Sequence, residues 1–517
     1  MDDDSLASAL AEFLTRRCGS SVRVSAIRQL AGGASCRLFA FDLDDGSSTR
    51  TLVLRLDSDG GPARSDRREE FALLSAAARA GVTVPAVHWS GDAGEGLGGA
   101  FFIMDEVAGE AIARRLLRDA RYENTRRALP RHLAREAAHT HRIDVADEGI
   151  GFLRGREPGG NDPRRYALAE IDKYRQILGA FADDHPYPLL LLTARWLEQH
   201  APAVQSPALV HGDFRIGNVM FNENGLTAVL DWELAHIGDP VEDLGWLCVR
   251  TWRFGSDALA AGGLCSREDL LRFYREEGGA EVDAEHLKYW ELFGNWKWAI
   301  ICRMQAERHK AGRRPDVELA TIGRRVAETE DELLALGALG AGGEAGSDSP
   351  GSELGGTELA QGHVPEHVHA RPRQTADQAA ARQGLRDKPG GTELLEALGV
   401  FLDDISARLE GSARFKAIVG ANVVGIVARE IALSPAHDRA QALRLAALLR
   451  RHDAITPSCD HGAVARQLSF ELCRRIQAGD ADTGPWRADV LAHLRATVDE
   501  KLAIDNPGRL GRSQRGA

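Results

Sequence analysis

The sequence predicts an α+β fold followed by a carboxy-terminal all-α domain, and three patterns along the chain indicate it. The first hundred residues alternate short apolar runs around one helical segment, and a mainly helical region follows. A stretch rich in Gly, Ser, Pro, His and charge then separates this region from a second set of apolar helical stripes. We therefore expect a small β-rich lobe over 1–108, a helical lobe over 109–336, a flexible linker over 337–390 and a helical domain over 391–510.

The small lobe is expected to contain five strands and one helix. Alternating apolar residues predict the strands, and apolar residues recurring every three or four positions predict the helix. The strands fall at 21–30, 36–43, 48–56, 86–91 and 100–109, and the helix falls at 66–81.

Composition and charge exclude several broad functions. The 76 acidic and 64 basic residues give a net charge of −12, which opposes a general role in coating nucleic acid. No run approaches the ~20 uninterrupted apolar residues that span a bilayer, and the start is acidic, so no membrane association and a cytoplasmic location are expected. The 7 cysteines lack a CxxC pair or metal-like spacing, so we expect them to be reduced.

One segment, LVHGDFRIGNVMFNENGLTAVLDWE, places polar residues on loops around a predicted hairpin with its turn at 222–225. Phosphoryl transfer needs a carboxylate that orients and deprotonates the attacking hydroxyl, together with oxygen ligands for Mg²⁺. Asp213, Asn218 and Asp231 supply these groups. Alternatively, Asp213 and Asn218 make only turn hydrogen bonds and Asp231 caps a strand end. Their joint order and spacing favour the first interpretation.

The segment resembles the aminoglycoside phosphotransferase and choline kinase superfamily, whose catalytic loop reads HxDxxxxN and is followed by a metal-binding Asp. The resemblance implies a two-lobed protein-kinase-like fold that binds ATP and Mg²⁺. It also implies that Asp213 is the catalytic base and that Asn218 and Asp231 are metal ligands. His211 would support the loop, and the guanidinium of Arg215 would meet the γ-phosphate.

The same resemblance implies that the small lobe binds the nucleotide. The implied residues lie on a glycine loop, a strand, a helix and the hinge: Gly32, Gly33, Arg55, Glu70, Glu106 and Val107. Arg55 stands where the superfamily has lysine, and its longer, planar group alters the phosphate geometry. A subgroup fused ahead of acyl-CoA dehydrogenases also uses arginine there. The alternatives are that the glycine pair forms only a turn and that the hinge residues end an ordinary strand.

Downstream residues bear on the loop and on the substrate. In GDPVEDLGW, Asp239 is expected to cap a helix and Asp243 to be structural. Residues 289–334 resemble the acyl-CoA-dehydrogenase-linked subgroup and combine tryptophans with cations: Trp290, Trp296, Trp298, Arg303, Arg308, His309, Lys310, Arg313, Arg314, Arg324 and Arg325. Such a border favours an anionic acceptor, for example a hydroxyacyl-CoA, over a polycationic aminoglycoside. The alternative is that the tryptophans fill the core and the charges lie on solvated faces.

The carboxy-terminal helices resemble a bacterial domain of unknown function that occurs beside such kinases, and a role in partner docking or homo-oligomerisation is expected of them. Three functions stay open. The first is a kinase that phosphorylates a hydroxyl of a small metabolite, the second an antibiotic-modifying kinase, and the third a nucleotide-binding pseudokinase. The complete set of Asp213, Asn218 and Asp231 favours activity, and Arg55 alone favours the pseudokinase.

Overall fold

The computed structural model describes residues 2–30, 36–57, 66–310, 317–337, 339, 391–456 and 459–510. The chain divides into two compact units, Met1–Ile301 and Cys302–Ala517. The predicted glycine loop with Gly32 and Gly33 lies outside the described residues, as does nearly all of the predicted linker over 337–390.

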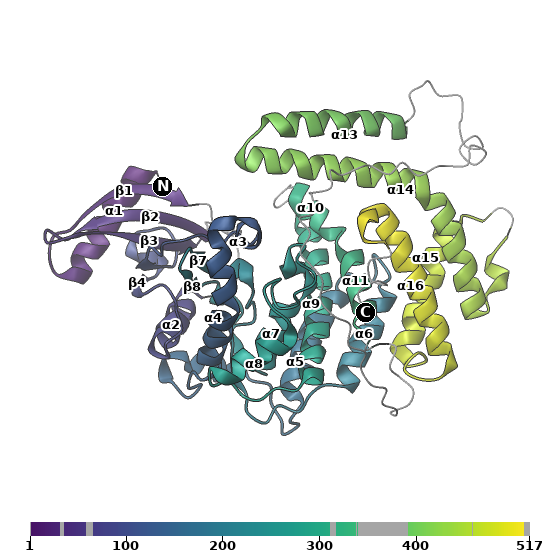
Figure 1. The fold of residues 1–517 in the computed structure, drawn as a ribbon, viewed down its shortest axis with the longest axis horizontal. Coiled ribbons are helices and arrows are strands. Elements are labelled where there is room, and N and C mark those ends of the chain that lie inside the picture. Colours follow the sequence, from purple (N-terminus) through teal and green to yellow (C-terminus); the bar gives the residue numbers. More distant parts are fainter. Residues whose placement is uncertain are drawn as a thin grey trace, which may run out of the picture. The chain divides into compact units, whose positions relative to one another are not determined.

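The first unit begins with a helix and a five-stranded antiparallel sheet of order β1-β2-β3-β5-β4 (Figure 1). These elements are α1 (Asp3–Cys18), β1 (Arg23–Leu30), β2 (Cys36–Asp44), β3 (Thr49–Asp57), α2 (Arg67–Arg79), β4 (Val87–Gly91) and β5 (Phe101–Asp105). The predicted strands and helix are confirmed. Helix α1 was not predicted, and it packs Phe13 against Phe101 of the sheet at 5.0 Å between ring centroids.

The rest of the first unit is mainly helical. Its helices are α3 (Ala113–Arg118), α4 (Glu123–His141), α5 (Arg165–Gly179), α6 (Pro188–Gln199), α7 (Val241–Cys248), α8 (Arg267–Glu276) and α9 (Ala284–Lys310), of which α9 runs on into the second unit. Two short strand pairs lie among them: β6 (Ala208–Val210) with β9 (His236–Gly238), and β7 (Val219–Asn222) with β8 (Gly225–Val229). The β7–β8 pair confirms the predicted hairpin.

The connector between the sheet and the helices is bonded to this hairpin. The amide N–H of Glu110 donates to the carbonyl of Phe221 at 2.9 Å, and the amide N–H of Phe221 donates to the carbonyl of Glu110 at 3.0 Å. Gly109 has φ +132°, and a Cβ there would lie 2.5 Å from the Phe221 carbonyl oxygen. Only glycine fits this close approach without a shift of the backbone.

The second unit is helical. It contains α10 (Val317–Gly323), α11 (Val326–Ala335), α13 (Gly391–Arg408), α14 (Gly411–Leu449), α15 (His461–Ala478) and α16 (Pro485–Asp505). The helical domain predicted over 391–510 contains the long continuous helix α14. Pro435 lies inside α14 and removes a single backbone N–H, while the chain on its carboxy-terminal side packs against α15 and α16.

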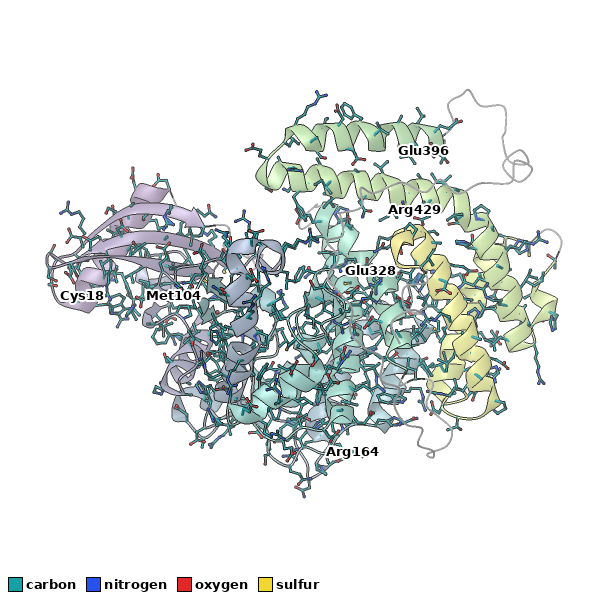
Figure 2. All side chains as sticks on the ribbon, viewed as in Figure 1. Cys18, Met104, Arg164, Glu328, Glu396 and Arg429 are labelled. Atoms are coloured by element: carbon teal, nitrogen blue, oxygen red, sulfur yellow. The ribbon has the colours of Figure 1, made fainter. Side chains whose placement is uncertain are left out.

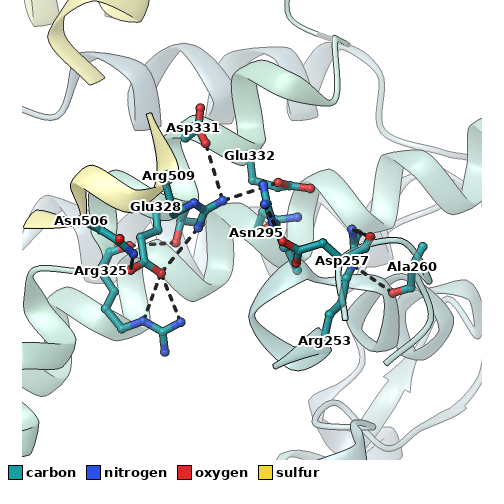
Figure 3. A network of polar contacts seen from close by, with 12 residues as sticks. Arg253, Asp257, Ala260, Asn295, Arg325, Glu328, Asp331, Glu332, Asn506 and Arg509 are labelled. Atoms are coloured by element: carbon teal, nitrogen blue, oxygen red, sulfur yellow. Dashed lines mark hydrogen bonds and ion pairs between the residues drawn. The ribbon is translucent and has the colours of Figure 1, made fainter. Parts of the chain in front are cut away.

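Charged residues of α11 are held by the end of the chain. Glu330 accepts a hydrogen bond from Lys501 at 2.8 Å, and Asp331 accepts one from Arg495 at 2.7 Å. Figure 3 shows the neighbouring contacts of Glu328, which accepts a hydrogen bond from Asn506 at 2.8 Å. Both Glu330 and Asp331 are fully buried, so these pairs make α11 part of the core of the second unit.

Helix α14 bears on the expectation that the chain does not associate with a membrane. By length and composition it could cross a membrane, and 11% of its apolar window is buried. The prediction counted uninterrupted apolar runs, and Arg429 and Glu430 interrupt this helix. One such helix among the described residues is weak grounds for a membrane span.

Candidate active site

A buried aspartate of α7, Asp243, fixes the backbone of the loop at 211–218. The Asp243 carboxylate accepts hydrogen bonds from the backbone N–H of His211 at 2.8 Å and from that of Gly212 at 2.9 Å. Gly212 has φ +78°, and a Cβ there would lie 2.5 Å from the carbonyl oxygen of Leu234. This position therefore requires glycine, and the turn that it makes presents the next residue, Asp213.

His211 joins this loop to the end of the β7–β8 hairpin. Its Nδ1 accepts from the backbone N–H of Asp213 at 3.2 Å, so the other ring nitrogen carries the proton and donates to the Leu230 carbonyl at 3.0 Å. The ring is fully buried. These contacts agree with the expectation that His211 stabilises the loop.

Three donors fix the Asp213 carboxylate. One oxygen accepts from the indole N–H of Trp246 at 2.7 Å and from the Nε of Arg215 at 3.1 Å. The other accepts from the side-chain amide of Asn218 at 2.6 Å. Arg215 also lies over the Trp252 ring, with its guanidinium carbon 4.5 Å from the centroid. A carboxylate held in this way is oriented before any substrate arrives.

Asp231 lies close to Asn218 because of the hairpin register. The backbone N–H of Leu230 donates to the Asn218 carbonyl at 2.8 Å, and Asp231 is the next residue. Asp231 has φ +69°, an uncommon conformation that aspartate tolerates. Its side chain is 37% exposed, and the Asn218 amide nitrogen is already bonded to Asp213, which leaves the amide oxygen for a ligand. Two oxygen donors of this kind fit Mg²⁺.

Arg55 on β3 contacts carboxylates from two other elements. Its guanidinium lies 3.1 Å from Glu70 on α2 and 3.5 Å from Asp231. Burial raises the pKa of Glu70, and the charges of Arg55 and Arg67 oppose this shift. The Nε of Arg55 is buried and has no hydrogen-bond partner in the described part of the chain. An orphaned cationic donor at this place suits a phosphate oxygen.

The structure brings most of the predicted site residues together. Asp213, Arg215 and Asn218 are in direct contact, and Arg55 joins Glu70 to Asp231. The neighbouring Glu69 pairs instead with Arg156 at 2.6 Å.

The two hinge residues stand apart from this group in the contacts that the described residues make. Glu106 and Val107 follow β5. The Glu106 side chain is exposed and pairs with Arg28 at 2.5 Å, and its backbone N–H reaches the Thr51 carbonyl at 3.5 Å. Both partners belong to the sheet.

Sequence reasoning missed two residues that hold the loop. Trp246 lies three positions after Asp243, about one helical turn along α7, which could have indicated that it reaches the same loop. The ammonium of Lys297 donates to the Gly212 carbonyl at 2.9 Å and lies 3.3 Å from Glu242. A lysine between two tryptophans on an apolar helix is a signal of a buried, paired charge.

Beneath the loop, Glu170, His236 and Glu242 place their ligand atoms within 4.8 Å of one another. Both nitrogens of His236 face acceptors, the Leu234 carbonyl at 3.0 Å and Glu242 at 3.1 Å. A ring that donates through both nitrogens has no lone pair for a metal. Burial lowers the pKa of His236, but the charges of Glu170 and Glu242 outweigh it and raise the pKa to about 9. The cluster is therefore a buried ion pair.

This cluster predicts a pH dependence of stability. The folded pKa of His236 is above its unfolded value of about 6.5, so its contribution is complete below that pH and disappears as pH rises through about 9. We expect the free energy of unfolding to fall by up to about 3 kcal/mol over this range. Denaturant unfolding of the parent protein and of His236→Gln, each at a pH of about 6.5 and at a pH above about 9, measures this fall in the free energy of unfolding. Equal pH slopes for the two proteins would contradict it.

The tryptophans and cations of residues 289–334 were expected either to border an anionic substrate or to fill the core and the solvated faces. Trp290 and Trp296 are fully buried, which agrees with tryptophans that fill the core. Arg324 pairs with Glu430 at 2.6 Å and with Asp505 at 2.8 Å, both within the second unit. Arg325 likewise lies 3.3 Å from Glu328, and Arg303 pairs with Glu307. The side chains of Arg308, Lys310, Arg313 and Arg314 lie outside the described residues.

Asp239 is structural, as expected, although Pro240 and not Asp239 is the N-cap of α7. Its carboxylate accepts from the backbone N–H of Val241 at 3.0 Å, from His286 at 2.7 Å and from the Trp290 indole at 2.9 Å. The aspartate thus fixes the start of α7 to α9, and with it the position of Asp243.

A sequence model described as the phosphotransferase enzyme family matches residues 26–299, a little over half of the chain. The chain belongs to this phosphotransferase family. The matched range contains the loop, the hairpin and the Arg55–Glu70 pair. A second model, a domain of unknown function (DUF6285), matches residues 407–509.

Curated relatives of this phosphotransferase include "Probable acyl-CoA dehydrogenase IBR3" of Arabidopsis thaliana, 28% identical over 53% of this chain and 35% of that protein. Another is acyl-CoA dehydrogenase family member 10 of Mus musculus, 29% identical over 44% of this chain and 21% of that protein. The chain thus spans about a third or less of the length of these relatives.

Solved structures of similar fold include the following one. It is a Ralstonia eutropha JMP134 protein provisionally described as an aminoglycoside phosphotransferase, 23% identical, with a TM-score of 0.50 over 62% of this chain and 95% of that one. Together with the antiparallel sheet and the helical lobe, this similarity agrees with the expected kinase-like α+β fold and all-α tail.

Proposed function

We propose that this phosphotransferase uses ATP to phosphorylate a hydroxyl group of a small molecule. The contacts of Asp213 carry the proposal: an oriented carboxylate lies 2.6 Å from the amide of Asn218, and the hairpin sets Asp231 beside Asn218. A carboxylate base next to two oxygen ligands for a metal is the arrangement that phosphoryl transfer requires.

In the proposed reaction the acceptor hydroxyl binds against Asp213, which takes its proton as the new bond from oxygen to the γ-phosphorus forms. The bond between the γ-phosphorus and the bridging oxygen breaks, and ADP leaves. Arg55, through its unpartnered Nε, and Arg215 would bind phosphate oxygens. Asn218 and Asp231 would hold Mg²⁺, which supplies charge stabilisation on the phosphates when bound.

For the acceptor we propose an anionic metabolite of the hydroxyacyl-CoA class. Two observations support this class: the curated relatives are named as acyl-CoA dehydrogenases, and the cation nearest the base is Arg215, stacked on Trp252. Arg324 and Arg325, which pair with carboxylates of the second unit, lend no support to it.

One experiment tests both the kinase activity and the class of acceptor. The full chain is incubated with labelled ATP, Mg²⁺ and a panel of hydroxyacyl-CoAs, free hydroxy acids and aminoglycosides. We expect label on the hydroxyacyl-CoAs and none on the aminoglycosides. Transfer to aminoglycosides alone overturns the acceptor class and keeps the kinase. Nucleotide binding without transfer to any acceptor in the panel or in a metabolite extract overturns the kinase and favours a pseudokinase.

Trp246→Phe is expected to lower kcat by about tenfold and leave the KM for ATP nearly unchanged. The substitution removes the indole N–H that holds the base at 2.7 Å and keeps most of the ring packing. Trp252→Phe is the matched control, because its indole nitrogen has no hydrogen-bond partner in the described residues. Steady-state kinetics of both variants measure the difference. Equal losses would mean that ring packing, and not the hydrogen bond, is responsible.

A further inference from the structure

An exposed apolar row runs along α13, which pairs with the first part of α14 in a helical hairpin (Figure 1). The row consists of the exposed residues Leu394, Leu398 and Phe401 and continues to the half-buried Ile405. Leu394 is 55% exposed, Leu398 44% and Phe401 57%, and no residue of α13 is buried. Their spacing of four, three and four residues is the seam of a coiled coil.

A second apolar row of α13 already packs on α14. Leu395 and Leu402 are half-buried, as is Leu409 just after the end of the helix, and Leu402 lies against Gly420 of α14. The hairpin therefore uses one apolar side of α13 and leaves the adjacent row at Leu394–Ile405 without cover in the described residues. Monomeric proteins rarely expose such a continuous row.

Charge at the two ends of α13 indicates what covers this row. Glu393 and Glu396 lie near its start, and Arg408 lies at its end, where it also pairs with Asp404 at 2.6 Å. Two copies of α13 placed antiparallel bring Arg408 of one copy beside Glu393 of the other. A parallel arrangement sets like charges together.

We propose that the Leu394–Ile405 row docks on the same row of a second copy of this chain, antiparallel and around a twofold axis. Two hairpins then form a four-helix bundle, the geometry in which each helix buries a stripe of this width. This inference is independent of the catalytic activity.

Two other ways of covering the Leu394–Ile405 row, by another segment of the same chain or by a lipid surface, fit the observations less well. The preceding residues 340–390 of the same chain hold few large apolar side chains that could fill the row. A lipid surface suits α14 by composition, but α13 carries four carboxylates, at Glu393, Glu396, Asp403 and Asp404. An anionic leaflet repels them. Glu396 lies on α13, near its start, and Arg429 lies on α14 (Figure 2).

Sedimentation equilibrium of the full chain over a roughly hundredfold range of concentration tests the proposal. We expect a mass of twice the chain. Phe401→Glu should weaken association by at least about a hundredfold, because it places a charge in the seam. Val400→Glu is the matched control: Val400 is 71% exposed on the opposite side of the same helix, so its effect should stay within about threefold. Circular dichroism verifies that both variants keep their helices.

Charge exchange tests the orientation. Arg408→Glu should weaken association by about tenfold, and adding Glu393→Arg should restore it. A chain that is monomeric at every concentration, or equal effects of Val400→Glu and Phe401→Glu, overturns the proposal. Flotation with phosphatidylcholine and phosphatidylserine vesicles by a chain that stays monomeric also overturns it, in favour of a membrane surface.

Discussion

Replacing Asp213 with Asn is expected to lower the rate of phosphoryl transfer by at least about a thousandfold, with nucleotide affinity changed by less than about threefold. The amide keeps an oxygen for the Trp246 and Arg215 donors and loses the hydrogen bond from Asn218, and it takes up no proton from the acceptor. Single-turnover transfer from labelled ATP measures the rate, and titration with a fluorescent ATP analogue measures the affinity.

Asp172→Asn is the control for this experiment, because Asp172 is an exposed aspartate on α5 far in sequence from the loop. It should leave both quantities unchanged. Transfer by Asp213→Asn within tenfold of the parent protein would remove Asp213 from the role of base. A large loss of nucleotide affinity would instead assign it to binding.

Asp243→Ala is expected to lower the free energy of unfolding by about 3 to 5 kcal/mol and to abolish transfer. The carboxylate is fully buried and accepts from the backbone N–H groups of His211 and Gly212, and from His141 at 3.1 Å. Removal leaves these buried donors without a partner and frees the loop that presents Asp213. Denaturant unfolding followed by tryptophan fluorescence gives the free energy.

The comparison for this variant is Asp172→Ala, which removes an exposed carboxylate of the same size and should change stability by less than about 0.5 kcal/mol. A loss below about 1 kcal/mol for Asp243→Ala would show that the two backbone amides find other partners.

The positions of Asn218 and Asp231 could be predicted from the sequence because residues close in the chain determine them. A two-residue hairpin turn and a shift of register between Met220 and Phe221 set the β7–β8 pairing, which places Leu230, the residue before Asp231, against Asn218. Trp246 and Lys297 could not be predicted in the same way. They reach the loop from residues 33 and 85 positions away, through helix packing that no local pattern encodes.

The fold shows the same division. Strand and helix periodicity identified the sheet, helix α2 and the helical character of the remaining regions, but it did not identify α14 as one continuous helix through Pro435. The sequence shows that Arg324 and Arg325 are charged but not which carboxylates they contact, so both were counted among the cations expected to border the substrate. Their carboxylate partners, among them Asp505 and Glu328, come from packing within the second unit.

Two backbone hydrogen bonds, between Glu110 and Phe221, join the connector between the sheet and the helices to the β7–β8 hairpin. Rocking of the sheet over the helices must then pivot on this connection. Such a motion changes the separation of Arg55 from Asp231 and leaves the spacing of Asp213, Asn218 and Asp231 constant. In the proposed reaction, such a motion would change how Arg55 contacts the triphosphate and would leave the position of the proposed base, Asp213, relative to Asn218 and Asp231 unchanged.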